Sequence, residues 1–400
     1  MRVLFISNPR IGSAFPLVPL AWAVRSAGHD VLFGAAGDGL AVELAGLDVV
    51  DVLPGADDRR IRKAKRLADP ESFVPLTLPG AGRHTVAPPP GGFVPWALPE
   101  FLAVAHAWRP DLIVSDPAQT EGLLVAAALD VPIVLHGRGL LRTAGLPSAI
   151  RRNCTAFDDN GWDLPEHIRH IGVAPASILL SEPDGWSMRP VPYNGGGVLA
   201  DWPHEPSRRI LLTLGTAPVG THGSATVERI VALAGRVDAE FVLALGDQAT
   251  AIPGALPRNV RSVGWVPLST MLRSCAAVVH HGGAGTTLCS LDAGVPQLVV
   301  PDGAEAVLHA DAVVSRGCGL RCRPDELDED VLTSLTGAAR FRANAAEVRA
   351  ELAAMPAPAD LVPRLAELAD AAEAARSASV VAAGLPVVLG RLDDRGSLLS

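Results

Sequence analysis

Charged residues are scarce in this sequence. They make up only 19% of the 400 positions, whereas hydrophobic residues make up 48%. This balance supplies ample core material and is unlike that of disordered chains. The net charge of −9 argues against a surface for nucleic acid or for an anionic membrane. The one basic stretch, residues 59–66, is equally typical of a solvated loop or helix face.

Long apolar runs and clustered cysteines are absent as well. No run approaches the ~20 apolar residues of a membrane helix, and residues 1–6 lack the long apolar core and cleavage site of a signal peptide. The five cysteines are an odd number in scattered positions, which is typical of a reducing cytoplasm. Cys318 and Cys322 have no second pair or histidine cluster nearby, so we expect no metal site and a cytoplasmic protein.

Strands and helices alternate along the chain. A strand at 2–7, a Gly/Pro-containing turn and a helix at 17–27 open the first half, and a fresh strand at 209–214 opens the second. This alternation predicts an α/β fold with parallel sheets and helices on both faces. Two stretches, 57–99 and 141–175, lack a clear pattern. We interpret the first as an acceptor-binding loop or as a variable surface excursion.

The length suits two domains of ordinary size, and a Gly/Pro-rich stretch predicts a linker between them. We expect the following boundaries: an N-terminal domain over 1–195, a linker over 196–208, a C-terminal domain over 209–358, a helix over 359–376 and a loose tail over 377–400.

The most informative segment is 278–287, which reads VVHHGGAGTT. An apolar strand leads into it, and a helical stretch follows it up to Ala293. Glycines let backbone N–H groups approach an anion closely, and a helix N-terminus adds a partial positive charge. We therefore predict a phosphate site in which a histidine donates a hydrogen bond or, if protonated, a full charge. No lysine follows the glycines and the spacing is not G-x-G-x-x-G, so a P-loop and a nicotinamide site both fit poorly.

This segment, followed by Ala-Gly-Val-Pro-Gln at 293–297, resembles the nucleotide-sugar signature of bacterial natural-product glycosyltransferases with the GT-B fold. Those enzymes attach deoxysugars to enediynes and aromatic polyketides. The likeness extends over roughly residues 1–370 and is carried by four further segments: GWVP at 264–267, LTLGT at 212–216, the N-terminal unit at 1–30 and WRPDLIVSD at 108–116.

The resemblance implies two Rossmann-like, doubly wound domains that face each other across a cleft, with the 359–376 helix crossing back to the first domain. It implies an inverting transferase that moves a deoxysugar from a dTDP donor to a polyketide-like acceptor in antibiotic biosynthesis. It implies no metal and no cofactor beyond the nucleotide sugar. The partners would be that donor and a small-molecule aglycone, and a homodimer is compatible with the family.

On the donor side, the resemblance assigns the diphosphate contacts to five residues: His281, Gly283, Gly285, Thr286 and Thr216. A helix N-cap is an alternative for Thr216, and His280 has the alternative of pointing into the sheet. Trp265 and Val266 take the nucleobase, although Trp265 also reads as a core aromatic.

The resemblance assigns the sugar contacts to Glu305 and His309, which follow the next strand. Glu305 stands where the family has an acidic residue, since a carboxylate can accept from sugar hydroxyls. His309 stands where the family commonly has an asparagine. Surface solvation is the alternative for Glu305.

On the acceptor side, the family commonly places a histidine base in the first turn, and Ser13 stands there. A serine hydroxyl is not a general base near neutral pH, while Asp116 matches the carboxylate that usually orients the histidine. Three explanations remain open. Asp116 is the base, directly or through water or Ser13; or His136 or His84 substitutes, His136 being favoured at its strand end; or the acceptor is acidic enough to need little help.

Ser13 also motivates an alternative from another class, a non-catalytic or partner-dependent relative that kept the fold. A nucleotide-sugar epimerase on the same fold is a third candidate.

Overall fold

The computed structural model describes residues 1–67, 75–76, 85–86, 93–180, 182–183, 185–197, 208–215, 221–246 and 255–382. Two candidate residues, Thr216 and His84, lie outside these ranges, as does most of the expected linker. None of the described helices is long and apolar enough to cross a membrane.

The first half of the chain folds around a seven-stranded sheet in the order β3-β2-β1-β6-β7-β8-β9, and every strand pair in it is parallel. Its central strands are continuous apolar runs, as expected for strands covered on both faces. The strands are β1 (Arg2–Ile6), β2 (Asp30–Ala35), β3 (Val49–Asp51), β6 (Leu112–Ser115), β7 (Ile133–His136), β8 (Ile168–Gly172) and β9 (Trp186–Ser187).

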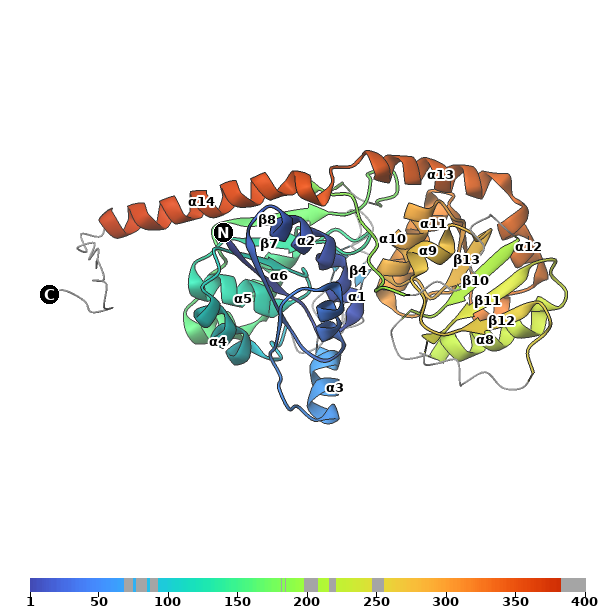
Figure 1. Ribbon diagram of the computed structural model, residues 1–400, viewed down its shortest axis with the longest axis horizontal. Coiled ribbons are helices and arrows are strands. Elements are labelled where there is room, and N and C mark those ends of the chain that lie inside the picture. Colours follow the sequence, from blue (N-terminus) through green and yellow to red (C-terminus); the bar gives the residue numbers. More distant parts are fainter. Residues whose placement is uncertain are drawn as a thin grey trace.

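Helices cover both faces of this sheet (Figure 1). They are α1 (Ile11–Ala14), η1 (Phe15–Leu17), α2 (Val18–Ser26), η2 (Gly37–Ala45), α3 (Asp58–Leu67), α4 (Leu98–Trp108), α5 (Thr120–Leu129), α6 (Leu146–Asn153) and α7 (Thr155–Asn160). The strands β4 (Pro75–Leu76) and β5 (Thr85–Val86) form a separate antiparallel pair.

The second half repeats the plan with a six-stranded parallel sheet in the order β12-β11-β10-β13-β14-β15. Its strands are β10 (Arg209–Thr213), β11 (Glu240–Ala244), β12 (Val260–Val263), β13 (Ala277–His280), β14 (Gln297–Val299) and β15 (Gly319–Arg321). Its helices are α8 (Thr221–Ala234), α9 (Leu268–Leu272), α10 (Ala284–Ala293), α11 (Ala304–Ser315), η5 (Pro324–Glu326), α12 (Glu329–Gly337) and α13 (Ala339–Ala354). The α/β prediction is therefore confirmed in both halves.

One stretch that we expected to be irregular, 141–175, contains regular structure. Helices α6 and α7 form there, and β8 pairs with β7 to extend the sheet. Pro147 lies in the first turn of α6, where its fixed φ favours a helix start. The prediction was wrong because elements of five to eight residues hold too few periods for a hydrophobic pattern to emerge.

The last helix, α14 (Pro358–Ala382), runs back over the first domain, as the resemblance implied (Figure 1). Leu361 and Leu365 are buried in the same cluster as Leu17. Near its far end, Nη1 of Arg376 donates to the carbonyl of Asp130 at 2.8 Å. The helix ends at Ala382, beyond the expected end at 376.

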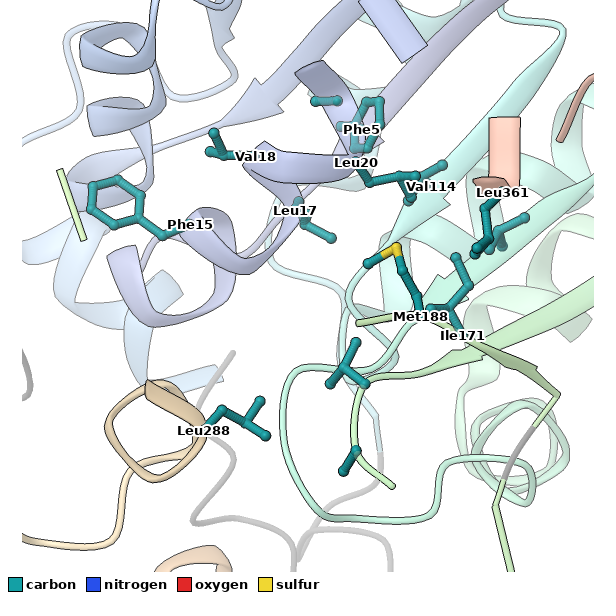
Figure 2. Packing of buried hydrophobic residues seen from close by; sticks show 14 of the residues in the cluster. Phe5, Phe15, Leu17, Val18, Leu20, Val114, Ile171, Met188, Leu288 and Leu361 are labelled. Carbon is teal, nitrogen blue, oxygen red and sulfur yellow. The ribbon is translucent and has the colours of Figure 1, made fainter. Parts of the chain in front are cut away.

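The two domains share apolar contacts. Phe15 and Leu17 belong to one buried cluster with Leu288 of α10, which lies in the second domain (Figure 2). This cluster joins η1 and the start of α2 to the helix that follows the glycine-rich turn. The segments after β1 and β13 are thereby brought to the same region.

The carboxyl ends of both sheets face this junction. A Cβ on Gly139, after β7, would lie 3.0 Å from Cβ of Ala284 at the start of α10. A larger residue at position 139 would therefore require its neighbours in the second domain to shift. In open parallel sheets, ligands bind beyond the carboxyl ends of the strands, so the interdomain junction is the place to look for a site.

Candidate active site

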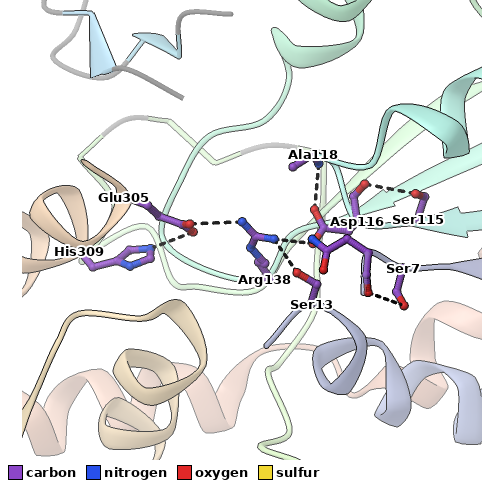
Figure 3. Close-up of polar contacts among 9 residues, drawn as sticks. Ser7, Ser13, Ser115, Asp116, Ala118, Arg138, Glu305 and His309 are labelled. Atoms are coloured by element: carbon purple, nitrogen blue, oxygen red, sulfur yellow. Dashed lines mark hydrogen bonds and ion pairs between the residues drawn. The ribbon is translucent and has the colours of Figure 1, made fainter. Parts of the chain in front are cut away.

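Ser13 and Asp116 lie together on the acceptor side, and Arg138 joins them (Figure 3). Nη1 of Arg138 donates to Oγ of Ser13 at 2.8 Å and to Oδ2 of Asp116 at 2.6 Å. The other oxygen of Asp116 accepts the N–H of Ala118 at 2.8 Å. Only 2% of Asp116 and 4% of Ser13 is exposed, so both are held in a defined geometry at the edge of the sheet.

Arg138 also reaches across to the second domain. Its Nη2 donates to Oε2 of Glu305, in the first turn of α11, at 3.2 Å. Burial opposes the charge of Arg138, but the nearby carboxylates of Asp116 and Glu305 outweigh it and raise the pKa of Arg138 above its ordinary value. Burial likewise opposes ionisation of Glu305, and Arg138 overcomes it and lowers the pKa of that carboxyl. One cation thus holds two carboxylates from opposite domains.

His309 connects the domains through both of its ring nitrogens. Nδ1 lies 2.8 Å from the carbonyl of Gly282, and the N–H of Leu140 donates to Nε2 at 3.4 Å. The two contacts fit the neutral tautomer with the proton on Nδ1, and burial lowers the pKa of His309. The ring is fully buried, and its contact with the carbonyl of Gly282 holds the turn.

His280 is part of the sheet. Its Nε2 lies 2.9 Å from Oε1 of Gln297, and its Nδ1 accepts the N–H of Gly282 at 3.1 Å. Burial and, to a smaller extent, the adjacent His281 together lower the pKa of His280 to about 3. The expectation that His280 points into the sheet is confirmed, and its function is to fix the backbone of the turn.

His281 stands apart from the sheet between two glycines. A Cβ on Gly283 would lie 2.5 Å from its Nε2, and a Cβ on Gly215 would lie 2.5 Å from its Cε1. Burial lowers the pKa of His281 to about 4, so the ring is neutral near pH 7 and offers one N–H donor. Its Nδ1 is buried without a hydrogen-bond partner among the described residues.

The α10 helix begins directly after this histidine. Gly283 is the N-cap, and Gly285 and Thr286 follow in the first turn. The first N–H groups of a helix have no partner within the helix, and the side chain of the N-cap residue, a glycine, offers none. The turn therefore presents backbone donors next to a neutral histidine donor, which together can stabilise an anionic oxygen.

Trp265 and Val266 lie between β12 and α9, at the carboxyl edge of the same sheet as the glycine-rich turn. Half of Trp265 is exposed, at 52%, which rules out the alternative of a core aromatic in this structure. A Cβ on Gly195 would lie 3.4 Å from Nε1 of Trp265, so the indole lies against the end of the first domain. Val266 packs against the apolar cluster around α9. An exposed indole face is suited to stacking on a base.

Comparison with known proteins agrees with this geometry. Residues 228–368 match the C-terminal domain of the family described as erythromycin biosynthesis protein CIII-like, and residues 93–215 match its N-terminal domain. The elloramycin glycosyltransferase of Streptomyces olivaceus is 40% identical over 372 residues, covering 91% of this chain and 97% of the relative. The chain belongs to the erythromycin biosynthesis protein CIII-like family. It is a glycosyltransferase.

Solved structures resemble this chain over 92% of its length. The glycosyltransferase SnogD from Streptomyces nogalater superposes with a TM-score of 0.76 at 36% identity, covering 92% of this chain and 99% of that one. The Streptomyces sp. SF2575 glycosyltransferase SsfS6, solved with thymidine diphosphate, superposes with a TM-score of 0.72 at 29% identity, with coverages of 92% and 99%. The GT-B arrangement expected from the sequence is confirmed.

His136 makes no hydrogen bond with Ser13 or Asp116, although the nearby charge of Asp116 acts to raise its pKa. It is 1% exposed, and neither ring nitrogen has a hydrogen-bond partner among the described residues. Burial lowers the pKa of His136 to about 4. Arg138 was not among the candidates, although its place two residues after the end of β7 put it at the same sheet edge as Asp116.

No group of three or more His, Cys, Asp or Glu side chains within the described ranges could hold a metal ion.

Proposed function

We propose that this glycosyltransferase moves a deoxysugar from a dTDP donor to an aromatic polyketide acceptor, with inversion at the anomeric carbon. The observation that carries the donor half is the position of His281, a neutral donor fixed between Gly215 and Gly283 beside the N-terminus of α10. The relative solved with thymidine diphosphate supports that nucleotide. The elloramycin relative supports an aromatic acceptor over an enediyne.

In this proposal the diphosphate lies on the glycine-rich turn. His281 and the N–H groups of Gly283, Gly285 and Thr286 stabilise the negative charge that develops as the bond to the sugar breaks. The nucleobase stacks on Trp265 and lies against Val266. Thr216 is a further phosphate contact in the proposal, although it lies outside the described residues.

The sugar lies between the turn and α11. Glu305 is placed to accept hydrogen bonds from sugar hydroxyls. His309 holds the carbonyl of Gly282 at 2.8 Å and thereby keeps the turn in register with the first domain.

The acceptor oxygen lies beside Asp116 and Ser13, with His136 behind them on the next strand. These groups belong to the first domain and the diphosphate turn belongs to the second. The nucleophile and the leaving group therefore lie on opposite sides of the sugar. In-line attack across the cleft supports inversion.

Donor binding tests the first half of this proposal. Titration of the protein with dTDP by calorimetry should give saturable binding that His281→Ala and Trp265→Ala both weaken. A matched control is His106→Ala, a histidine of α4 outside the site. If dTDP does not bind, or if both variants bind it as well as the native chain, the donor assignment is wrong.

Turnover tests the second half. The purified protein is incubated with dTDP-L-rhamnose and a panel of aromatic polyketide aglycones, and glycoside is measured by mass spectrometry. Conversion of the donor without acceptor would indicate an epimerase. No conversion by the protein alone, but activation of a second transferase, would indicate a non-catalytic partner.

We also propose a cytoplasmic enzyme that forms a homodimer. All five cysteines are free and buried, as suits a reducing compartment. Trp22 and Leu44 are exposed apolar side chains on adjacent segments, linked through the hydrogen bond from Trp22 to the carbonyl of Ala45. Light scattering on the purified protein measures its mass, and a monomer at all concentrations would contradict the dimer.

A further inference from the structure

The guanidinium of Arg138 occupies the space between residue 13 and Asp116. In the family resemblance, this is the space of a histidine that accepts the proton of the acceptor. Here Nη1 spans the gap, with Ser13 at 2.8 Å on one side and Asp116 at 2.6 Å on the other. A cation therefore stands where a base is expected.

Arg138 cannot take a proton from the acceptor, because a guanidinium stays charged at every physiological pH. Asp116 is already engaged, since its two oxygens accept from Ala118 and from Arg138.

The other titratable groups that face Arg138 do not supply a base either. Glu305 is paired with Arg138 itself and also feels the charge of Arg10. Both nitrogens of His309 are occupied by backbone groups. Neither His136 nor His281 is hydrogen-bonded to Arg138 among the described residues. Burial lowers the pKa of each to about 4, which makes both of them weak proton acceptors.

Arg138 retains the capacity to bind a ligand. Its described hydrogen bonds involve three of the five guanidinium N–H donors, and 13% of the side chain is exposed. Asp116 and Glu305 already offset the charge of Arg138. What the guanidinium offers an acceptor is its remaining N–H donors, which bond an anionic oxygen more strongly than a neutral hydroxyl.

We propose that Arg138 binds the acceptor in its ionised form, so that the acceptors of this enzyme are acidic phenols or enols rather than aliphatic alcohols. This inference rests on the proposed function. The proton of the hydroxyl passes to solvent as the acceptor binds. The oxyanion then forms the bond to the anomeric carbon, the bond from that carbon to the diphosphate oxygen breaks, and dTDP leaves with the electron pair.

The magnitudes are consistent with this class of acceptor. A cation at hydrogen-bond distance lowers the pKa of an acid by roughly 1–3 units. A phenol with a pKa of about 10 would then titrate at roughly 7–9, so that up to about half of it is ionised at pH 7. An aliphatic alcohol, with a pKa close to the roughly 15.7 of water, stays un-ionised under the same shift.

Alizarin is a suitable probe, because it is a phenolic anthraquinone whose ionised form absorbs at longer wavelength. Its absorbance is titrated against pH with and without saturating protein. We expect the apparent pKa of bound alizarin to fall by about one to three pH units. The shift should be lost in Arg138→Gln and partly kept in Arg138→Lys. The matched control is Arg151→Gln, an arginine of the same domain that pairs with Asp158 and Asp163.

Each outcome is decisive for the proposal. Bound alizarin with an unshifted pKa, an undiminished shift in Arg138→Gln, or no saturable binding of alizarin would overturn it. Binding of dTDP by each variant, measured separately, reports whether the fold and donor site persist. Loss of the alizarin shift with intact dTDP binding supports the role of Arg138, whereas failure of the native protein to bind dTDP rejects the proposed function instead.

Discussion

The imidazole of His281 lies directly against Gly215, so that a Cβ on that glycine would come within 2.5 Å of Cε1. The two residues follow different strands, β13 and β10, which are neighbours in the sheet. The orientation of the histidine therefore depends on the absence of a side chain at position 215. Gly215 also has a φ of +69°, a conformation that disfavours other residues.

Removal of the His281 imidazole should lower turnover. We expect His281→Ala to lower kcat/KM for the donor by about 10–1,000-fold, because one donor to a developing oxyanion typically contributes that much. The measurement is steady-state kinetics with varied donor. His281→Gln, which keeps an N–H donor, should retain more activity than His281→Ala. A loss within about twofold for His281→Ala would contradict the role.

Displacing the His281 imidazole should lower turnover just as removing it does. Gly215→Ala places a methyl group where the imidazole lies, so we expect weaker dTDP binding and slower turnover. The control is Gly235→Ala, where a Cβ would meet nothing within 4 Å. Equal dTDP affinity for the two glycine variants would show that the ring position does not matter.

The acceptor side can be tested through Asp116 and Ser13. Asp116 anchors Arg138 at 2.6 Å through a charged hydrogen bond, whereas Ser13 offers a neutral acceptor at 2.8 Å. We therefore expect Asp116→Asn to lower kcat more than Ser13→Ala does. The pH dependence of kcat/KM separates two explanations. If Asp116 is the base, Asp116→Asn should abolish the fall of kcat/KM at acidic pH. If Asp116 only positions Arg138, that fall should remain in the variant.

The donor half could be predicted from the sequence because its signals are local. The glycines, the histidine and the helix start occupy ten consecutive residues, 278–287, and the physics of a helix N-terminus needs no long-range information. The parallel strands were recognisable for the same reason, since each is a short apolar run.

The acceptor half could not be predicted in the same way. Arg138 meets Asp116 across 22 positions and Glu305 across 167, and no periodicity encodes such a pairing. The contact of His309 with the N–H of Leu140 joins residues 169 positions apart in the same way. Both pairings arise from how the domains meet, which a single sequence does not specify.

The fit between the domains should depend on Gly139. A Cβ there would lie 2.7 Å from Nε2 of His309, a ring held on both sides and unable to yield. We expect Gly139→Ala to raise the donor KM several-fold and to increase the radius of gyration in small-angle scattering. Gly145→Ala, with nothing within 4 Å of the added carbon, is the control. Unchanged KM and scattering for Gly139→Ala would contradict the prediction.

Glu121 should make the stability of the first domain depend on pH. The carboxyl is 1% exposed and accepts hydrogen bonds from the N–H groups of Trp96 and Ala97 and from Nε2 of Gln119. Burial outweighs these donors and raises the pKa of Glu121 from 4.5 to about 7. The protonated form is thus favoured in the folded state.

The sign of the effect follows from the direction of that shift. The stability contributed by the raised pKa is fully present below the unfolded value of 4.5 and is lost as the pH rises through about 7. The loss is on the order of 3 kcal/mol at about 1.4 kcal/mol per pH unit. Urea unfolding at a series of pH values measures it. Glu121→Gln, which stays neutral, should flatten this part of the profile, whereas Glu367→Gln, at an exposed position of α14, should leave it unchanged. A native profile that rises between those pH values and is unaffected by Glu121→Gln would show that the carboxyl is ionised throughout.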